Sequence, residues 1–216
     1  MDKIKEKLIN IFFPKFCLGC GREGSYLCED CQACLDISEN IFCLCEKPKI
    51  LNKDGKCDQC HHLFLDGLYF PLSYQKTLSK KIIDNFRKEP YIRELSHPLA
   101  ELIIDHFLLL EKEENFFKDK TITFLPITKN EEKKIGYNPN EEIAKDLSLF
   151  LEIPLFEYLE KKKKEIKTKK EKKIKPEKIF LVTTLYKKGV LMNKAAKILK
   201  ENGAKEIWGI AVTRSK

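Results

Sequence analysis

From residue 68 onward, apolar residues recur with two alternating spacings, one typical of helices and one typical of strands. The helical spacing predicts helices over residues 78–88, 98–110, 139–151 and 190–202, with a further short helix over residues 1–13. β-Branched and apolar runs predict strands over residues 68–74, 121–127, 178–182 and 206–213. Strands alternate with helices from residue 121, which predicts an α/β fold with a mostly parallel sheet flanked by helices.

Residues with known preferences for helix ends support these boundaries. Ser96 is expected to cap the second helix, with Pro98 in its first turn. Asn138 is expected to cap the helix that begins at Pro139, and Gly203 follows the last long helix in the position where glycine is favoured.

The cysteines are confined to one short segment. All nine lie between positions 17 and 60, and eight of them form four close pairs: Cys17 and Cys20, Cys28 and Cys31, Cys43 and Cys45, and Cys57 and Cys60. Three pairs have two intervening residues, the spacing with which a tight turn presents two thiolates to one zinc ion. We predict two structural zinc sites in an N-terminal zinc-ribbon module, residues 1–65, followed by an α/β domain, residues 66–216.

The spacing leaves the ligand sets open. In a sequential arrangement, the first four paired cysteines bind one ion and the last four bind the other, whereas a crossed arrangement joins the outer pairs. The pair of Cys43 and Cys45 is one residue short, so Cys34, His61 or His62 is an alternative ligand. Unliganded buried thiols or a redox site are a further alternative.

Composition and charge patterning place the chain among compact cytoplasmic proteins. The 216 residues are 43% hydrophobic and 34% charged, which favours a packed core over disorder. The apolar runs are too short to span a bilayer, and charges within residues 1–13 argue against a secretory signal. We therefore expect a cytoplasmic protein without a membrane span, in a compartment where thiols stay reduced.

The positive charge is concentrated in one lysine-rich segment. Residues 159–178 contain eleven lysines and four glutamates, a net charge of +7 out of +8 for the whole chain. This segment either binds the phosphates of single-stranded DNA or is a solvated linker. Residues 17–60 instead carry five basic and eight acidic side chains, and each zinc with four thiolates would add a formal charge of about −2. The module is thus expected to be structural, or a docking surface for a partner protein.

Several motifs, in this order, are similar to those of the ComF family of natural competence. The chain has Phe-Pro-x-x-Cys before four cysteine pairs, then Ile-Ile-Asp-Asn-Phe-Arg-Lys at 82–88, Leu-Pro-Ile-Thr at 125–128, Gly-Tyr-Asn at 136–138 and Gly-Ala-Lys at 203–205. The resemblance implies a phosphoribosyltransferase-like domain. It also implies a role in handling incoming single-stranded DNA beside a competence helicase or other uptake machinery.

The chain departs from the family where phosphoribosyl diphosphate would bind. The family pattern has two acids at a strand end and then a threonine-rich phosphate loop, but here Thr183 and Thr184 replace the acids. Lys187 and Lys188 replace loop threonines, and Gly189 remains. Without the acids, Mg²⁺ is not expected. These five residues are predicted to form a degenerate phosphate-binding loop, and the alternative is an ordinary strand-to-helix turn.

Three functions therefore compete. We favour a ComF-like protein that binds single-stranded DNA or a phosphate ligand without transferase activity, and we assign no catalytic residue. The alternatives are an active phosphoribosyltransferase and a zinc-ribbon adaptor that docks a helicase or uptake channel. His106 is expected to be a satisfied or exposed histidine with no ligand role.

Overall fold

The centre of the molecule is a parallel sheet. The computed structural model describes residues 14–163, 165–169 and 177–215, so the predicted helix over residues 1–13 lies outside the described residues. The sheet has the order β3-β9-β8-β5, β4 also pairs with β9, and every pairing is parallel. Its five strands are β3 (Gly67–Tyr69), β4 (Leu72–Ser73), β5 (Lys120–Phe124), β8 (Lys178–Tyr186) and β9 (Glu206–Arg214). This arrangement confirms the predicted α/β fold.

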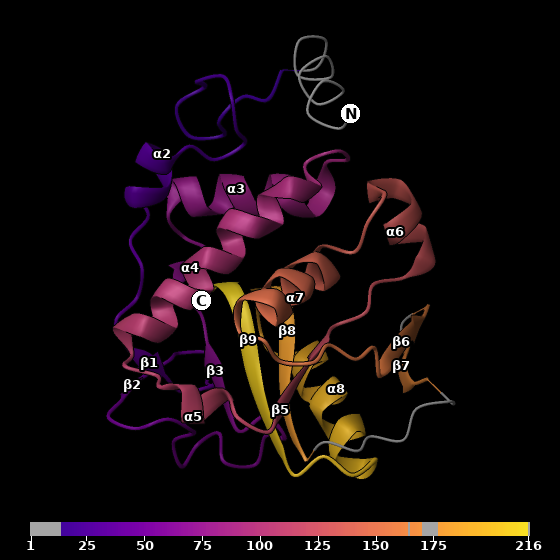
Figure 1. Ribbon diagram of the computed structural model, residues 1–216. Coiled ribbons are helices and arrows are strands. Elements are labelled where there is room, and N and C mark those ends of the chain that lie inside the picture. The colour runs from indigo at the N-terminus through magenta and orange to yellow at the C-terminus, as the bar shows by residue number, and fades with distance from the viewer. Residues whose placement is uncertain (1–13, 164, 170–176, 216) are drawn as a thin grey trace.

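Helices cover both faces of the sheet (Figure 1). The first core, on one face, contains residues of α3 (Thr77–Lys88), α4 (Ser96–Leu109) and α7 (Pro139–Phe150). The second core, on the other face, contains residues of α8 (Val190–Glu201). Along β8, Phe180 and Val182 enter the first core while Ile179 and Leu181 enter the second. A strand buried on both faces is apolar at successive positions, which is why these residues form a run without alternation.

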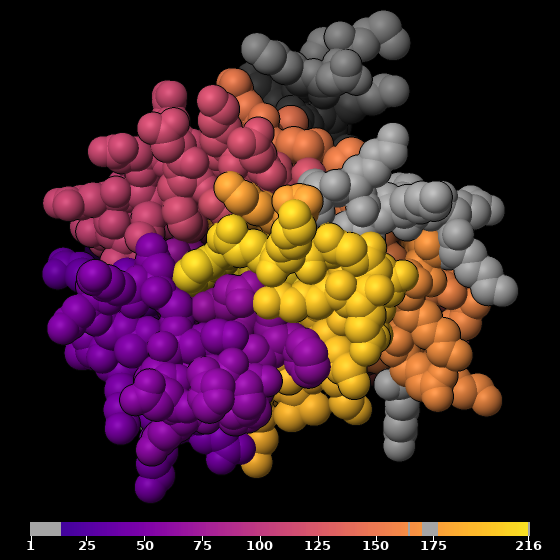
Figure 2. Space-filling model, turned by 90° about the horizontal axis from the view of Figure 1, so that it is seen from below, coloured from indigo at the N-terminus to yellow at the C-terminus, as the bar shows by residue number. Residues whose placement is uncertain are grey.

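The cysteine-containing segment, residues 14–65, packs against both cores. It contains α2 (Glu29–Ala33), β1 (Ile41–Phe42) and β2 (Ile50–Leu51), and the last two form an antiparallel pair. Leu27 and Leu35 belong to the first core, whereas Leu44 and Leu65 belong to the second. Figure 2 shows the purple surface of this segment directly beside the yellow surface of the C-terminal residues. The domain boundary after residue 65 stays a prediction.

Two predicted boundaries are wrong for identifiable reasons. The strand expected over residues 68–74 is split into β3 and β4, with Pro71 between them, because proline has no amide hydrogen to donate to a ladder. Ser96 does not cap α4, because the 3₁₀-helix η1 (Arg93–Leu95) runs directly into it and Ser96 is already helical.

Strand β8 is longer than expected and changes the position of the candidate phosphate site. The prediction ended this strand at residue 182, but β8 pairs with β9 as far as Tyr186 and Arg214. Thr183 and Thr184 therefore lie within a central strand and are buried. Only residues 187–189 remain between β8 and α8.

Two strands of the lysine-rich segment pair as an antiparallel hairpin, which corrects the linker alternative over those strands. Its strands are β6 (Leu159–Lys162) and β7 (Glu165–Thr168). Leu159 is buried in the second core and Ile166 packs against it. Residues 164 and 170–176 of the segment lie outside the described residues. Two short helices were also missed, α5 (Glu114–Phe117) and α6 (Lys129–Ile135).

The first core predicts a large difference between two apolar substitutions. The Phe86 side chain is fully buried on α3, so Phe86→Ala should lower the free energy of unfolding by about 3–5 kcal/mol. Leu149 on α7 is 75% exposed, and Leu149→Ala should change it by less than about 0.5 kcal/mol. Denaturant unfolding of the two variants checks this expectation, and similar midpoints would contradict the assigned core.

Candidate functional site

The eight paired cysteines form two separate groups of four. The first cysteine group is Cys17, Cys20, Cys28 and Cys31, and the second cysteine group is Cys43, Cys45, Cys57 and Cys60. Within each group, all the sulfur atoms lie within 4.8 Å of one another. This is the sequential arrangement and not the crossed one. Cys34, His61 and His62 belong to neither group.

The sulfur geometry fits a tetrahedral metal ion. The Sγ–Sγ distances are 3.6 Å between Cys20 and Cys28 and 3.5 Å between Cys45 and Cys57. A zinc–sulfur bond of about 2.3 Å places the corners of a tetrahedron about 3.8 Å apart, close to these values. Each group can thus surround one ion with four thiolates.

Backbone groups around the sulfur atoms also fit a metal-binding turn. The amides of Gly19 and Cys28 both donate to Cys17 Sγ over 3.4 Å. In the second group, the Lys49 amide donates to Cys43 Sγ over 3.2 Å. A Cβ at Gly19 would lie 2.5 Å from Cys31 Sγ, so only glycine fits this turn. Amide donors of this kind orient and stabilise thiolate ligands.

The crowded thiols do not ionise equally. Burial and the hydrogen bond with Cys57 raise the pKa of Cys45 to about 12. Burial opposes ionisation of Cys57 as well, but hydrogen bonds with Cys45 and Cys60 outweigh it and lower the pKa of Cys57 to about 7. Four simultaneous thiolates therefore need a cation among them, which is what a bound metal ion provides.

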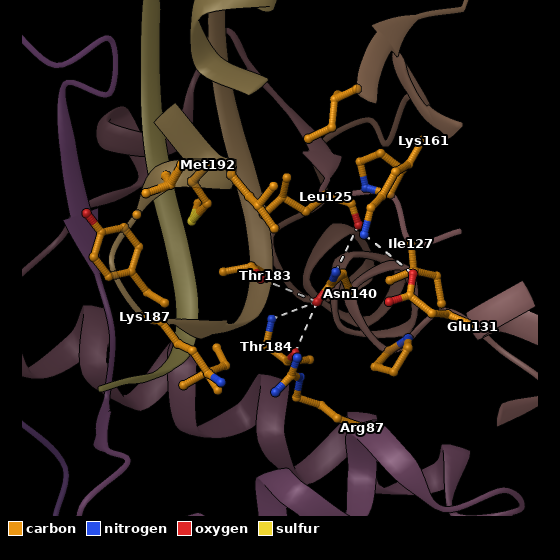
Figure 3. Close-up of a pocket in the computed structure, with 18 of the residues that line it drawn as sticks. Arg87, Leu125, Ile127, Glu131, Asn140, Lys161, Thr183, Thr184, Lys187 and Met192 are labelled. Atoms are coloured by element: carbon orange, nitrogen blue, oxygen red, sulfur yellow. Dashed lines mark hydrogen bonds and ion pairs between the residues drawn. The ribbon is translucent and has the colours of Figure 1, made fainter. Parts of the chain in front are cut away.

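A basic pocket of about 560 Å³ opens at the carboxyl ends of β5 and β8 (Figure 3). Ligands of parallel α/β proteins commonly bind at this edge of the sheet. Glu131 is the only acidic residue among those that line the pocket in the described part of the chain. Six cationic residues line it: Arg87, Lys88, Lys134, Lys161, Lys187 and Lys188. The pocket therefore favours an anion.

Asn140 organises the floor of this pocket, and the sequence reasoning missed it. Its Oδ1 accepts from the Thr184 amide at 2.8 Å, from Thr184 Oγ1 at 3.1 Å and from Thr183 Oγ1 at 3.5 Å. Its Nδ2 donates to the Leu125 carbonyl oxygen at 2.8 Å (Figure 3). Both threonine hydroxyls are thus engaged by one amide side chain. The local signal was the second asparagine of Asn138-Pro139-Asn140, but its partners are distant in sequence.

The loop between β8 and α8 can approach an anion closely. We call Tyr186, the last residue of β8, together with the three residues that follow it the 186–189 loop. Gly189 precedes α8 with a left-handed φ of 69°, and a Cβ there would lie 2.2 Å from Tyr186 Oη. Val190 and Leu191, in the first turn of α8, also line the pocket. Free amides and the helix dipole at this end favour negative charge, as do the exposed side chains of Lys187 and Lys188.

One residue of the lysine-rich hairpin enters the pocket as a cation. Lys161 Nζ lies 3.4 Å from Glu131 Oε2. Burial alone would raise the pKa of Glu131, but hydrogen bonds from Thr128 and the charge of Lys161 lower it. Glu131 therefore stays ionised and holds Lys161 at the pocket. Lys162 and Lys167 instead pair with glutamates of their own strands, Glu160 and Glu165.

His106 is a satisfied histidine, one of the two predicted alternatives, and it lies in the core. It is 1% exposed, and its Nδ1 lies 2.7 Å from the Ser38 carbonyl oxygen. Burial lowers the pKa of His106 to about 4, so the ring is neutral at physiological pH.

Comparison with protein-family models and with curated proteins finds no match to this chain. Fold and site thus define the class directly: a parallel α/β protein with two four-cysteine groups and a basic pocket. Within the described residues, every helix is too short or too polar to cross a bilayer.

The contacts of Asn140 predict a stability effect. Asn140→Ala would leave the buried Thr184 amide and Leu125 carbonyl without their partner and should lower the free energy of unfolding by about 2 kcal/mol. Asn202→Ala is the matched control, because the Asn202 side chain makes one exposed hydrogen bond to the Ile198 carbonyl. Equal unfolding midpoints for the two variants would contradict the assigned role.

Proposed function

We propose that this is a ComF-like cytoplasmic protein of natural competence that binds single-stranded DNA, or a related phosphate ligand, without transferring a phosphoribosyl group. The observation that carries the proposal is the set of six cationic residues around a pocket whose floor has two threonines where the family has acids. A competence helicase or other uptake machinery is the partner that the family resemblance implies.

The electrostatics of the pocket favour phosphate over other anions. Lys187 and Lys188 are exposed next to the first turn of α8, where amide donors complement phosphate oxygens. Lys161 approaches from the hairpin and Arg87 from α3, so cations surround the pocket from different elements. A chain of phosphates suits this arrangement because each one can neutralise a separate cation.

The same pocket is poorly suited to magnesium-dependent chemistry. Mg²⁺ prefers carboxylate oxygens, and Glu131, which lines the pocket, is paired with Lys161. Thr183 and Thr184 are uncharged, and their hydroxyls hydrogen-bond to Asn140. Their placement supports binding of an anion by lysines and arginine rather than by a metal.

The cysteine groups support two structural Zn²⁺ sites. Four thiolates at tetrahedral distances are typical of zinc, and a shell filled by four cysteines leaves no position for a substrate. The cysteine-containing segment has little regular structure of its own. The bound ions would therefore stabilise its fold against the sheet. Zinc would thus act on the fold and not directly on the DNA.

Metal content tests the zinc assignment. The purified chain should contain two zinc ions, one for each group, and Cys31→Ser should lower this content towards one. Cys34→Ser is the matched control and should retain both ions, because Cys34 lies outside the first group. Elemental analysis of the parent and the two variants measures their zinc contents. Equal contents in all three proteins would refute this ligand set.

Salt-dependent DNA binding tests the pocket. Replacing both Lys187 and Lys188 with glutamine should weaken binding of an oligothymidylate and reduce the slope of log K against log salt by about 1.4, or about 0.7 for each lost phosphate contact. The control replaces Lys194 and Lys197, which are exposed on α8 and do not line the pocket.

Fluorescence anisotropy across a salt series measures both quantities. The control should keep the slope of the parent. If the two double variants weaken binding equally, the lysines act only through net charge and the pocket is not the binding site.

A further inference from the structure

We propose that the second cysteine group positions the 186–189 loop through Tyr186 and Arg214, so that metal binding at this group sets the anion affinity of the basic pocket. The affinity part rests on the proposed function. The mechanical part, that this group holds the loop, can be tested by itself.

Three consecutive carbonyls, those of residues 43–45 at the second cysteine group, accept hydrogen bonds from the sheet. Arg214 at the end of β9 donates from Nη1 to the Cys43 carbonyl oxygen at 2.6 Å and from Nη2 to that of Cys45 at 2.5 Å. Tyr186 at the end of β8 donates its hydroxyl to the Leu44 carbonyl oxygen at 3.4 Å. All three carbonyls belong to the segment from Cys43 to Cys45. A bound ion would fix the backbone of this segment by holding the sulfur atoms of the two cysteines on either side of Leu44.

The same two side chains support the loop. Tyr186 and Arg214 are partners in the register of β8 and β9, and the guanidinium lies 5.2 Å from the centroid of the tyrosine ring. Tyr186 is 3% exposed, and its hydroxyl occupies the space beside Gly189 that a Cβ would need. Movement of Tyr186 would therefore displace the backbone that presents Lys187 and Lys188.

Charge strengthens this connection. A zinc ion with four thiolates has a formal charge of about −2, and Arg214 is a cation, 5% exposed, against two carbonyls of that group. Glu46 directly follows Cys45, and its Oε1 lies 3.6 Å from Lys188 Nζ. The second group is therefore joined to the loop by two hydrogen-bonding side chains and one surface ion pair.

The first cysteine group provides an internal control, because it packs elsewhere. The position of a Cβ at Gly19 lies 3.4 Å from Leu78 Cδ1 of α3, and the Tyr26 hydroxyl donates to the Tyr91 carbonyl oxygen at 3.3 Å. Loss of a metal ion from the first group should disturb the start of α3 around Leu78, away from Arg87 and Lys88 at its other end, and leave the 186–189 loop in place.

The experiment compares the full-length parent with Tyr186→Phe, Cys45→Ser and Cys20→Ser. The probe is a 5′-phosphorylated oligothymidylate with a 3′ fluorophore, and zinc content is measured in parallel. Tyr186→Phe should keep both ions and bind the probe about threefold more weakly, the effect of one lost hydrogen bond. Cys45→Ser should lose one ion and bind at least as weakly, while Cys20→Ser should lose one ion and bind within about twofold of the parent.

Hydrogen exchange separates this inference from the proposed function. Amides of residues 187–191 should exchange faster in Tyr186→Phe and Cys45→Ser and at the parental rate in Cys20→Ser. If the parent does not bind the probe, the proposed function fails while the exchange rates still decide whether the loop is held. Parental exchange rates in Tyr186→Phe and Cys45→Ser, or equal changes in both cysteine variants, would overturn the inference.

Discussion

The pairing of β8 with β9 is the interaction on which the rest of the structure depends. The two strands are in register from Lys178 and Glu206 to Tyr186 and Arg214, and both faces of this ladder are buried. The long register carries β8 past the apolar run to the threonines that form the pocket floor. It also brings Tyr186 and Arg214 together beneath the second cysteine group. Core, pocket and cysteine-containing segment thus share one pair of strands.

The cysteine-containing segment and the basic pocket carry opposite charge. The cysteine-containing segment has an excess of acidic residues, and the thiolate groups add to it when they bind metal. Among the described residues, six cations and one acid line the pocket at the end of β8. Phosphates are therefore attracted to the sheet edge and repelled from the cysteine groups. Under the proposed function, the cysteine-containing segment would therefore contribute to anion binding only through the backbone and side chains that it supports.

Local patterns were sufficient for the elements whose stabilising contacts are local. Close cysteine pairs predicted two metal sites and left the grouping open between the sequential arrangement that the structure has and a crossed one. Asn138 with Pro139 predicted the start of α7, where the Asn138 side chain does accept from a helix amide. The capping box of Thr128 and Glu131 was also present in the sequence and would have indicated α6.

Elements that depend on distant partners were not predictable in this way. The lysine-rich hairpin has poor intrinsic strand preference and forms because Leu159 and Ile166 pack on the second core. Asn140 contacts Thr183 and Thr184 across more than forty residues of chain, so no spacing rule could reveal it. The hydrogen bonds from Arg214 to the carbonyls of Cys43 and Cys45 also join residues that are far apart in the sequence, so no spacing rule could reveal them.

Calorimetric titration with phosphoribosyl diphosphate tests the central claim, that this pocket binds phosphate through lysines and arginine and not through a metal-dependent transferase site. With Thr183 and Thr184 held by Asn140, any binding should be insensitive to Mg²⁺ and weakened by salt. Micromolar binding that requires Mg²⁺ would contradict the account and restore the active phosphoribosyltransferase as the function of the fold.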